Sequence, residues 1–143
     1  QASFARLAGM DGPAPETTRT AAQQAGDAAE TLVARTLVDA GWTLLARNVH
    51  VGRHELDLVA TDPGPPAVLV IVEVRARGTA ARCSAVESIG PHKRRRIVQA
   101  TRHLLLRHAE WQSAPVRFDV VAFDAIDSSE PQVSWIQNAF DAS

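Results

Sequence analysis

The sequence has a single cysteine, Cys83, among 143 residues. One thiol can form no intramolecular disulfide and cannot build a multi-thiolate zinc or iron–sulfur site. We therefore expect a reduced thiol on the surface or in a loop. No apolar stretch approaches the ~18 residues of a membrane span, and the first residues lack the apolar core of a signal peptide. These absences predict a cytoplasmic protein with no membrane partner.

Two further features of nucleotide and nucleic acid binding are missing. No glycine-rich phosphate loop follows an expected strand, so nucleotide-dependent chemistry has no support. The three tryptophans, Trp42, Trp111 and Trp135, do not form an interleaved aromatic platform of the kind that binds single strands. We interpret them as core or interface residues.

The composition is that of a globular protein, with 45% hydrophobic and 22% charged residues. A chain of this length buries roughly two-thirds of the surface that it would expose when unfolded, which suffices for one domain. The first two dozen residues are rich in Gly, Pro, Ala, Thr and Gln without a sustained apolar period. We predict a flexible arm over residues 1–24 and a single domain over residues 25–143.

The formal net charge of −1 hides an uneven distribution along the chain. Between Trp42 and His108 there are 11 Lys and Arg against 5 Asp and Glu, a balance of 11 − 5 = +6, which leaves −7 for the rest. The middle of the chain is therefore suited to contact an anion.

The apolar periodicity predicts a helix that opens with Asp27 as N-cap and ends at Gly41. Glu30 faces the sheet from the stripe of this helix, and it is also placed to be the capping-box partner of Asp27. Strands are predicted over 42–51, 54–62, 67–77 and 116–126, with a second helix from Pro91 and a short fifth strand over 133–140. This order, helix, three strands, helix and strand, predicts an α/β domain with a central mixed sheet.

Acidic residues interrupt two of these strands. Side chains alternate across a strand, so Glu55, Asp57 and Val59 should share one face of the second strand, and His54, Leu56 and Leu58 the other. Glu73 and Arg75 should point the same way from the third strand. If the two strands form a hairpin, three carboxylates and a guanidinium converge at one end of the sheet.

Carboxylates gathered in this way are costly unless a positive charge compensates them. Mg²⁺ binds through a few carboxylate oxygens and keeps several waters, and beside a phosphodiester it can activate water. The alternative is structural: Glu55 faces solvent, and Asp57 or Glu73 pairs with Arg75. Spacing alone leaves both interpretations open.

A basic segment opens the second helix. The stretch HKRRR places four cations over one helical turn, where the helix dipole favours anions: Lys93, Arg94, Arg95 and Arg96. A phosphate backbone would explain them through non-specific, salt-sensitive contacts, which Arg53 and Arg77 could extend. The alternative is an ordinary solvated helix face.

Several pieces of the sequence, in order, resemble the YraN-like family of predicted endonuclease-like proteins. NVHVGRHELDLVA matches a segment in which the family has an Asn, a basic turn and GEIDLIA, and VIVEVRAR matches FVEVKxR. The match continues through RFDVVAF and WIQNAF and covers about residues 25 to 140. This family lies in the restriction-endonuclease-like superfamily with its PD-(D/E)XK signature, so the resemblance implies the same fold as the periodicity does.

The resemblance also implies roles for individual residues. Asp57 and Glu73 would bind Mg²⁺ or Mn²⁺, Glu30 would be an accessory catalytic acid, and Glu55 matches a family Glu of unresolved role. Lys93 stands where the family has a lysine that opens its second helix. Arg75 stands where the nuclease motif has a lysine. Because an arginine spreads its charge over a planar fork and keeps its proton, this exchange is not conservative.

The sequence therefore supports two functions. The first is a metal-dependent DNA endonuclease that acts on branched or damaged DNA. A homodimer is possible for this function. The second, favoured by Arg75, is a DNA-binding accessory protein of the nuclease fold with little or no catalysis. A glycosidase would use the carboxylates but would not explain the arginine-rich helix.

Overall fold

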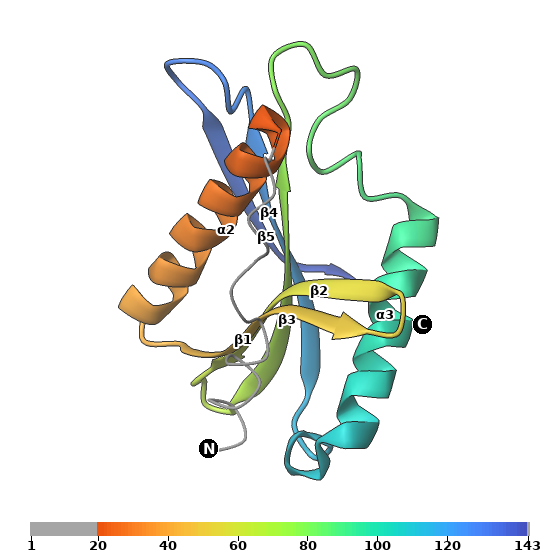
Figure 1. The fold of residues 1–143 in the computed structure, drawn as a ribbon. Helices are drawn as coiled ribbons and strands as arrows, with labels where there is room; N and C mark the ends of the chain where they lie inside the picture. The colour runs from red at the N-terminus through yellow and green to blue at the C-terminus, as the bar shows by residue number, and fades with distance from the viewer. Residues whose placement is uncertain (1–19, 143) are drawn as a thin grey trace.

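The computed structural model describes residues 20–142. The part of the predicted arm over residues 1–19 lies outside it. Two long helices and five strands make up the described chain: α2 (Ala21–Asp39), β1 (Thr43–Val51), β2 (His54–Asp62), β3 (Val68–Ala76), α3 (Pro91–Arg107), β4 (Val116–Asp124) and β5 (Gln132–Phe140). A 3₁₀ turn, η1 (Ala109–Trp111), follows α3 (Figure 1).

The five strands form one mixed sheet in the order β1-β2-β3-β4-β5. β1, β2 and β3 are an antiparallel meander, β3 and β4 are parallel, and β5 returns antiparallel to β4 as an edge strand. The parallel pair needs a crossover, which α3 provides. The predicted α/β class, the element order and the fifth strand are confirmed.

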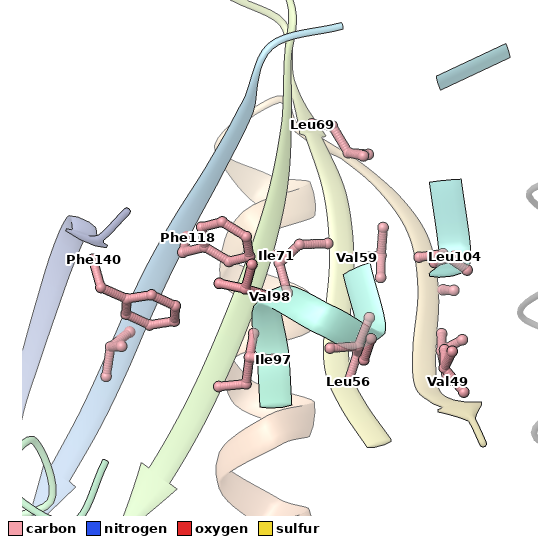
Figure 2. Packing of buried hydrophobic residues seen from close by; sticks show 14 of the residues in the cluster. Val49, Leu56, Val59, Leu69, Ile71, Ile97, Val98, Leu104, Phe118 and Phe140 are labelled. Carbon is pink, nitrogen blue, oxygen red and sulfur yellow. The ribbon is translucent and has the colours of Figure 1, made fainter. Parts of the chain in front are cut away.

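The sheet is covered on both faces, with α2 on one side and α3 on the other (Figure 1). Figure 2 shows the α3 side, where Ile97, Val98 and Leu104 of the helix pack on the sheet. On the other face, Val33 and Leu37 of α2 pack on side chains of the central strands. A strand between two such layers should be apolar on both faces, as β3 is from Leu69 to Val72.

The first helix begins earlier than the sequence analysis predicted. Thr20 is the N-cap, and its hydroxyl oxygen accepts from the backbone N–H of Gln23 at 3.1 Å, while its own N–H donates to Gln23 Oε1 at 2.9 Å. The prediction of Asp27 as N-cap, with Glu30 as its capping-box partner, is wrong. The alanines and glutamines before Asp27 are good helix formers, and T-x-x-Q is itself a capping box. The predicted boundary between arm and domain, at residue 25, falls inside α2. The predicted end of the helix at Gly41, which has φ of 91°, is confirmed.

The alternation of β2 is broken at Asp57. Leu56 belongs to the core on the α3 face and Leu58 to the core on the α2 face, so the prediction that they share a face is wrong. On β1, Asn48 lies between the two residues that pair with Leu58 and Leu56, and it has φ of 50°. A left-handed residue inside a strand disturbs the regular pleat on which the alternation rule depends.

Two simpler predictions can be compared with the described chain. Cys83 is an exposed free thiol in the loop before α3, as predicted. Within residues 20–142, neither helix has the length and apolarity that a membrane crossing requires.

Candidate active site

The centre of the site is a pair of carboxyl groups, Asp57 of β2 and Glu73 of β3. The pairing between these strands starts at Leu58 and Val72, and the strands are not paired beyond it, toward Asp57 and Glu73. Asp57 Oδ2 accepts from the backbone N–H of Val74 at 2.9 Å, and the two carboxyl groups lie close enough to shift the pKa of each other. We call Asp57 and Glu73 the carboxylate pair.

Glu73 is buried and Asp57 is half-buried, and the pKa of each carboxyl group is raised. Glu73 is 2% exposed, and its Oε2 has no hydrogen-bond partner within the described chain. Burial, and then the neighbouring charge of Asp57, raise the pKa of Glu73 to about 8. Burial also raises the pKa of Asp57, against the opposing effect of the Val74 N–H. Two acids in contact in a dry site cannot both ionise easily, so without a cation they share a proton, which we place on Glu73.

Lys93 brings an ammonium group to this pair from the first turn of α3. Its Nζ lies 3.5 Å from Glu73 Oε1, and about a third of its side chain is exposed. Its charge favours ionisation of both acids and lowers the pKa of each. The sequence analysis assigned Lys93 to phosphate contacts and did not predict its contact with Glu73, because the distance between a helix and a strand is set by packing.

Arg75 follows Glu73 by two positions on β3 and points toward the loop before α3. Its Nη2 donates to the backbone carbonyl of Ser88 at 3.5 Å, and its Nε is buried without a partner among residues 20–142. Its charge also lowers the pKa of Glu73, as the weakest of the contributing effects. The guanidinium is thus tied to a loop, whereas the ammonium of Lys93 contacts the carboxylate pair.

Glu30 and Glu55 are joined to each other by Asn48. With its amide nitrogen turned toward the acids, Asn48 donates to Glu30 Oε1 at 2.8 Å and to Glu55 Oε1 at 2.9 Å. Burial, and then the charge of Asp57, raise the pKa of Glu30 to about 8. Glu30 therefore faces the sheet as predicted, and it lies close enough to Asp57 to feel its charge.

The predicted meeting of three carboxylates is only partly realised. Asp57 and Glu73 are in contact, but Glu55 pairs with Glu30 through Asn48 and its other neighbour is His50, at 3.7 Å. Among residues 20–142, no three His, Cys, Asp or Glu side chains form a ready-made metal cluster. The sequence analysis missed Asn48; the available indication was that asparagine tolerates the left-handed backbone better than most residues do.

The carboxylate pair fits a small divalent cation. Mg²⁺ is commonly held by one or two carboxylates and keeps several of its waters, so it needs no third protein ligand. The unpartnered Oε2 of Glu73 is a donor atom with no other use in the described structure. A cation there would replace the shared proton, because metal ligands bind in their deprotonated form.

The basic residues fall on two sides of α3. Lys93 and Arg96 line a pocket of about 220 Å³ together with Arg53 and Glu55, on the side of the carboxylate pair. Arg94 and Arg95 line a larger hollow elsewhere along the helix. Arg77 lines neither; it extends β3, where its N–H donates to Phe123 O at 2.8 Å.

The chain matches the model of the uncharacterised protein family UPF0102 over residues 29–123. A UPF0102 protein of Paracidovorax citrulli is 44% identical over 134 residues, which is 92% of this chain and 93% of the relative. A UPF0102 protein of Pseudomonas aeruginosa strain LESB58 is 41% identical over 127 residues, 88% of this chain and 99% of the relative. The family match thus includes part of α2, β1 to β4 and α3, and all the residues of the site.

Proposed function

The chain belongs to the uncharacterised protein family UPF0102, and from its carboxylate pair we propose that it is a metal-dependent DNA endonuclease that hydrolyses phosphodiester bonds. The observation that carries the proposal is the buried Glu73, which keeps an unpartnered oxygen beside Asp57 and the ammonium of Lys93. Burying acids in this way is costly for stability and useful for binding a cation. Branched or damaged DNA is the proposed substrate class.

In this proposal Asp57 and Glu73 hold Mg²⁺ or Mn²⁺. When bound, the ion lowers the pKa of a bound water and neutralises charge on the phosphate oxygens. Asp57 is held in position by the hydrogen bond from the Val74 N–H, and Glu73 by the buried surroundings of its side chain. Glu30, aligned by Asn48, lies behind Asp57, and its raised pKa of about 8 suits it to exchange a proton with the site.

Lys93 takes the role that the nuclease motif gives to a lysine on the strand. Its ammonium is compact and lies beside Glu73, where it can pair with a phosphate oxygen as negative charge develops. Arg75 then supports the site at longer range, tied to the loop through Ser88. On this basis the arginine in the motif position does not prevent catalysis.

The DNA backbone is proposed to approach the pocket that Arg53, Lys93 and Arg96 line beside the carboxylate pair. Phosphate contacts of this kind position the duplex without reading its sequence, and they weaken with salt. A homodimer, which would allow both strands to be cut, stays a prediction.

A DNA-binding accessory protein without catalysis is the second candidate. Arg75 in place of the motif lysine favours it, because a guanidinium cannot release its proton to act as a general acid. In this case the carboxylate pair would have no catalytic use, and DNA binding would depend on Lys93 and the arginines.

A cleavage assay separates the two candidates. The substrates are linear, single-stranded, flapped and four-way-junction DNA, each with Mg²⁺ and then Mn²⁺. We expect cutting that depends on the metal and falls about 100-fold or more in Glu73→Gln. Glu130→Gln, the same change at an exposed glutamate, is the matched control and should cut normally.

Two further variants test the assignment of the lysine. Lys93→Ala should lower the cleavage rate at least about tenfold, whereas Arg75→Lys should not lower it, because Lys93 already supplies the ammonium. DNA binding without cutting, unchanged in Glu73→Gln, would overturn the nuclease in favour of the accessory protein.

A further inference from the structure

A second hollow, of about 640 Å³, lies between α3 and the end of β5. Figure 1 shows the C-terminal end of the chain beside this helix. Three arginines of α3 line the hollow, Arg94, Arg95 and Arg102, against one acid, Asp141. The carboxylate pair uses none of them, so their charge requires another explanation.

The base of the hollow presents Arg94 on an aromatic stack. Phe118 and Phe140 stack with their ring centroids 5.0 Å apart (Figure 2). The guanidinium of Arg94 lies over the Phe140 ring, 5.6 Å from its centroid, and its Nε donates to Ile89 O at 3.2 Å. Because Arg94 is exposed, the outer face of its guanidinium remains available to another planar group.

Arg95 and Arg102 stand two helical turns apart on the same side of α3, a rise of roughly 10 Å. Arg95 Nη2 lies 3.1 Å from His92 Nδ1, and Arg102 Nη2 donates to Ala142 O at 2.9 Å. Each guanidinium carries five N–H donors, so one such contact steadies it and leaves the other donors for an anion. The spacing suits an extended chain that carries charge at intervals.

We propose that this surface, the arginine groove of Arg94, Arg95, Arg102 and Phe140, binds an unpaired nucleic acid strand. Arg94 stacks against a base, and Arg95 and Arg102 contact phosphates along the backbone. Bases stack on arginine planes in many single-strand complexes, whereas an acidic peptide lacks the bases that would stack on the Arg94 guanidinium. A volume of this size accommodates a few nucleotides rather than a duplex.

The choice of ligand rests on the proposed function, because the groove and the carboxylate pair share α3. Lys93 and Arg96 face the pocket beside the carboxylate pair, and Arg94 and Arg95 face the arginine groove. An unpaired strand in the groove can therefore cross the first turn of α3 to reach the carboxylate pair. A branched substrate, with duplex and unpaired parts, would occupy both surfaces.

Binding measured by fluorescence anisotropy in EDTA tests the proposal without cleavage. The probes are a short single-stranded oligodeoxynucleotide, an abasic oligomer of the same length and a polyglutamate peptide. We expect Arg95→Ala with Arg102→Ala to bind the oligonucleotide about tenfold more weakly and to reduce the slope of log affinity against log salt by about 0.7 for each arginine. Arg107→Ala, an exposed arginine of α3 outside the groove, is the matched control and should bind normally.

Arg94→Lys separates stacking from charge. It keeps the cation but lacks the planar face, so it should bind the oligonucleotide and the abasic oligomer equally, whereas the unchanged protein should prefer the oligonucleotide. The proposal would be overturned if Arg95→Ala with Arg102→Ala weakened oligonucleotide binding no more than Arg107→Ala does. It would also be overturned if polyglutamate bound as tightly as the oligonucleotide. Absence of metal-dependent cutting with groove binding intact would instead overturn only the nuclease.

Discussion

Glu73 and Asp119 are both buried acids on adjacent strands, 2% and 0% exposed, yet their surroundings differ in kind. Asp119 is fully paired. Its two oxygens accept from Arg117 at 2.9 and 3.0 Å, from Trp135 Nε1 at 3.2 Å and from the Asn138 N–H at 3.0 Å. Glu73 has Asp57 and Lys93 as neighbours and an oxygen with no partner in the described chain.

The comparison shows that burial alone does not mark a functional acid. Asp119 and its partners form a closed set of hydrogen bonds, which compensates the loss of hydration and fixes β5 to β4. The Asp57 and Glu73 carboxyls form an open set, which is stabilised only when a proton or a cation joins it. Asp119 is therefore interpreted as structural and Glu73 as a ligand-binding group.

The largest expected effect is on the stability of the closed set. Asp119→Asn removes the buried counter-charge of Arg117 and leaves it, among the described residues, only Asp62 at 3.3 Å. We therefore expect the free energy of unfolding to fall by about 3 kcal/mol, because breaking a buried ion pair is strongly destabilising. Urea unfolding at neutral pH measures this change.

Glu73→Gln is the matched variant of the open set. At neutral pH a glutamine resembles the protonated glutamate that the metal-free protein holds and takes up no proton on folding, so the free energy of unfolding should not fall and should rise instead. Equal losses in the two variants would show that the two acids do not differ in the way described.

A second expected effect is a dependence of metal-free stability on pH. The pKa of Glu73 and that of Glu30 are each raised to about 8 from an ordinary 4.5. The folded state then keeps protons that the unfolded chain has released, so the unfolded chain binds fewer protons between these values. The stability that these acids contribute is complete below about pH 4.5 and is lost as the pH rises through about 8.

Unfolding measured in EDTA between pH 5 and pH 8 tests this dependence. The free energy of unfolding should fall by at most about 1.4 kcal/mol for each unit by which a pKa is raised. Glu73→Gln cannot release the proton and should show a smaller fall in stability over this range. If the variant and the unchanged protein lose the same stability, Glu73 does not hold a proton in the folded state.

Much of the fold could be predicted because it depends on local periodicity. The apolar stripe of α2 and the double-sided apolar run of β3 each follow from residues close in sequence. The start of α2 could also have been predicted from T-x-x-Q, but the polar composition before Asp27 obscured it. The face of Leu58 could not, because it depends on the left-handed backbone of Asn48 in the neighbouring strand.

The site was predictable only in part, because several of its contacts join residues that are far apart in the sequence. Asp57 and Glu73 directly adjoin the paired residues Leu58 and Val72 of the β2–β3 hairpin, so a predicted hairpin was enough to bring them together although the alternation of β2 breaks at Asp57. The contacts of Lys93 with Glu73 and of Trp135 with Asp119 depend on how a helix and an edge strand pack on the sheet. Spacing in the sequence does not determine such distances.

The smallest expected effect concerns Asn48, which joins Glu30 and Glu55 and has a matched counterpart in Asn138 of β5. Both asparagines have positive φ, 50° and 53°, a conformation that glycine adopts without strain. Asn48→Gly therefore removes the amide that joins the two acids without adding backbone strain, and we expect a loss of about tenfold or less in metal-dependent cleavage. Asn138→Gly keeps its backbone N–H to Asp119 and should cut at the normal rate. Equal cleavage rates in the two variants would show that the alignment of Glu30 by Asn48 does not matter for the reaction, and would limit the functional set to the carboxylate pair and Lys93.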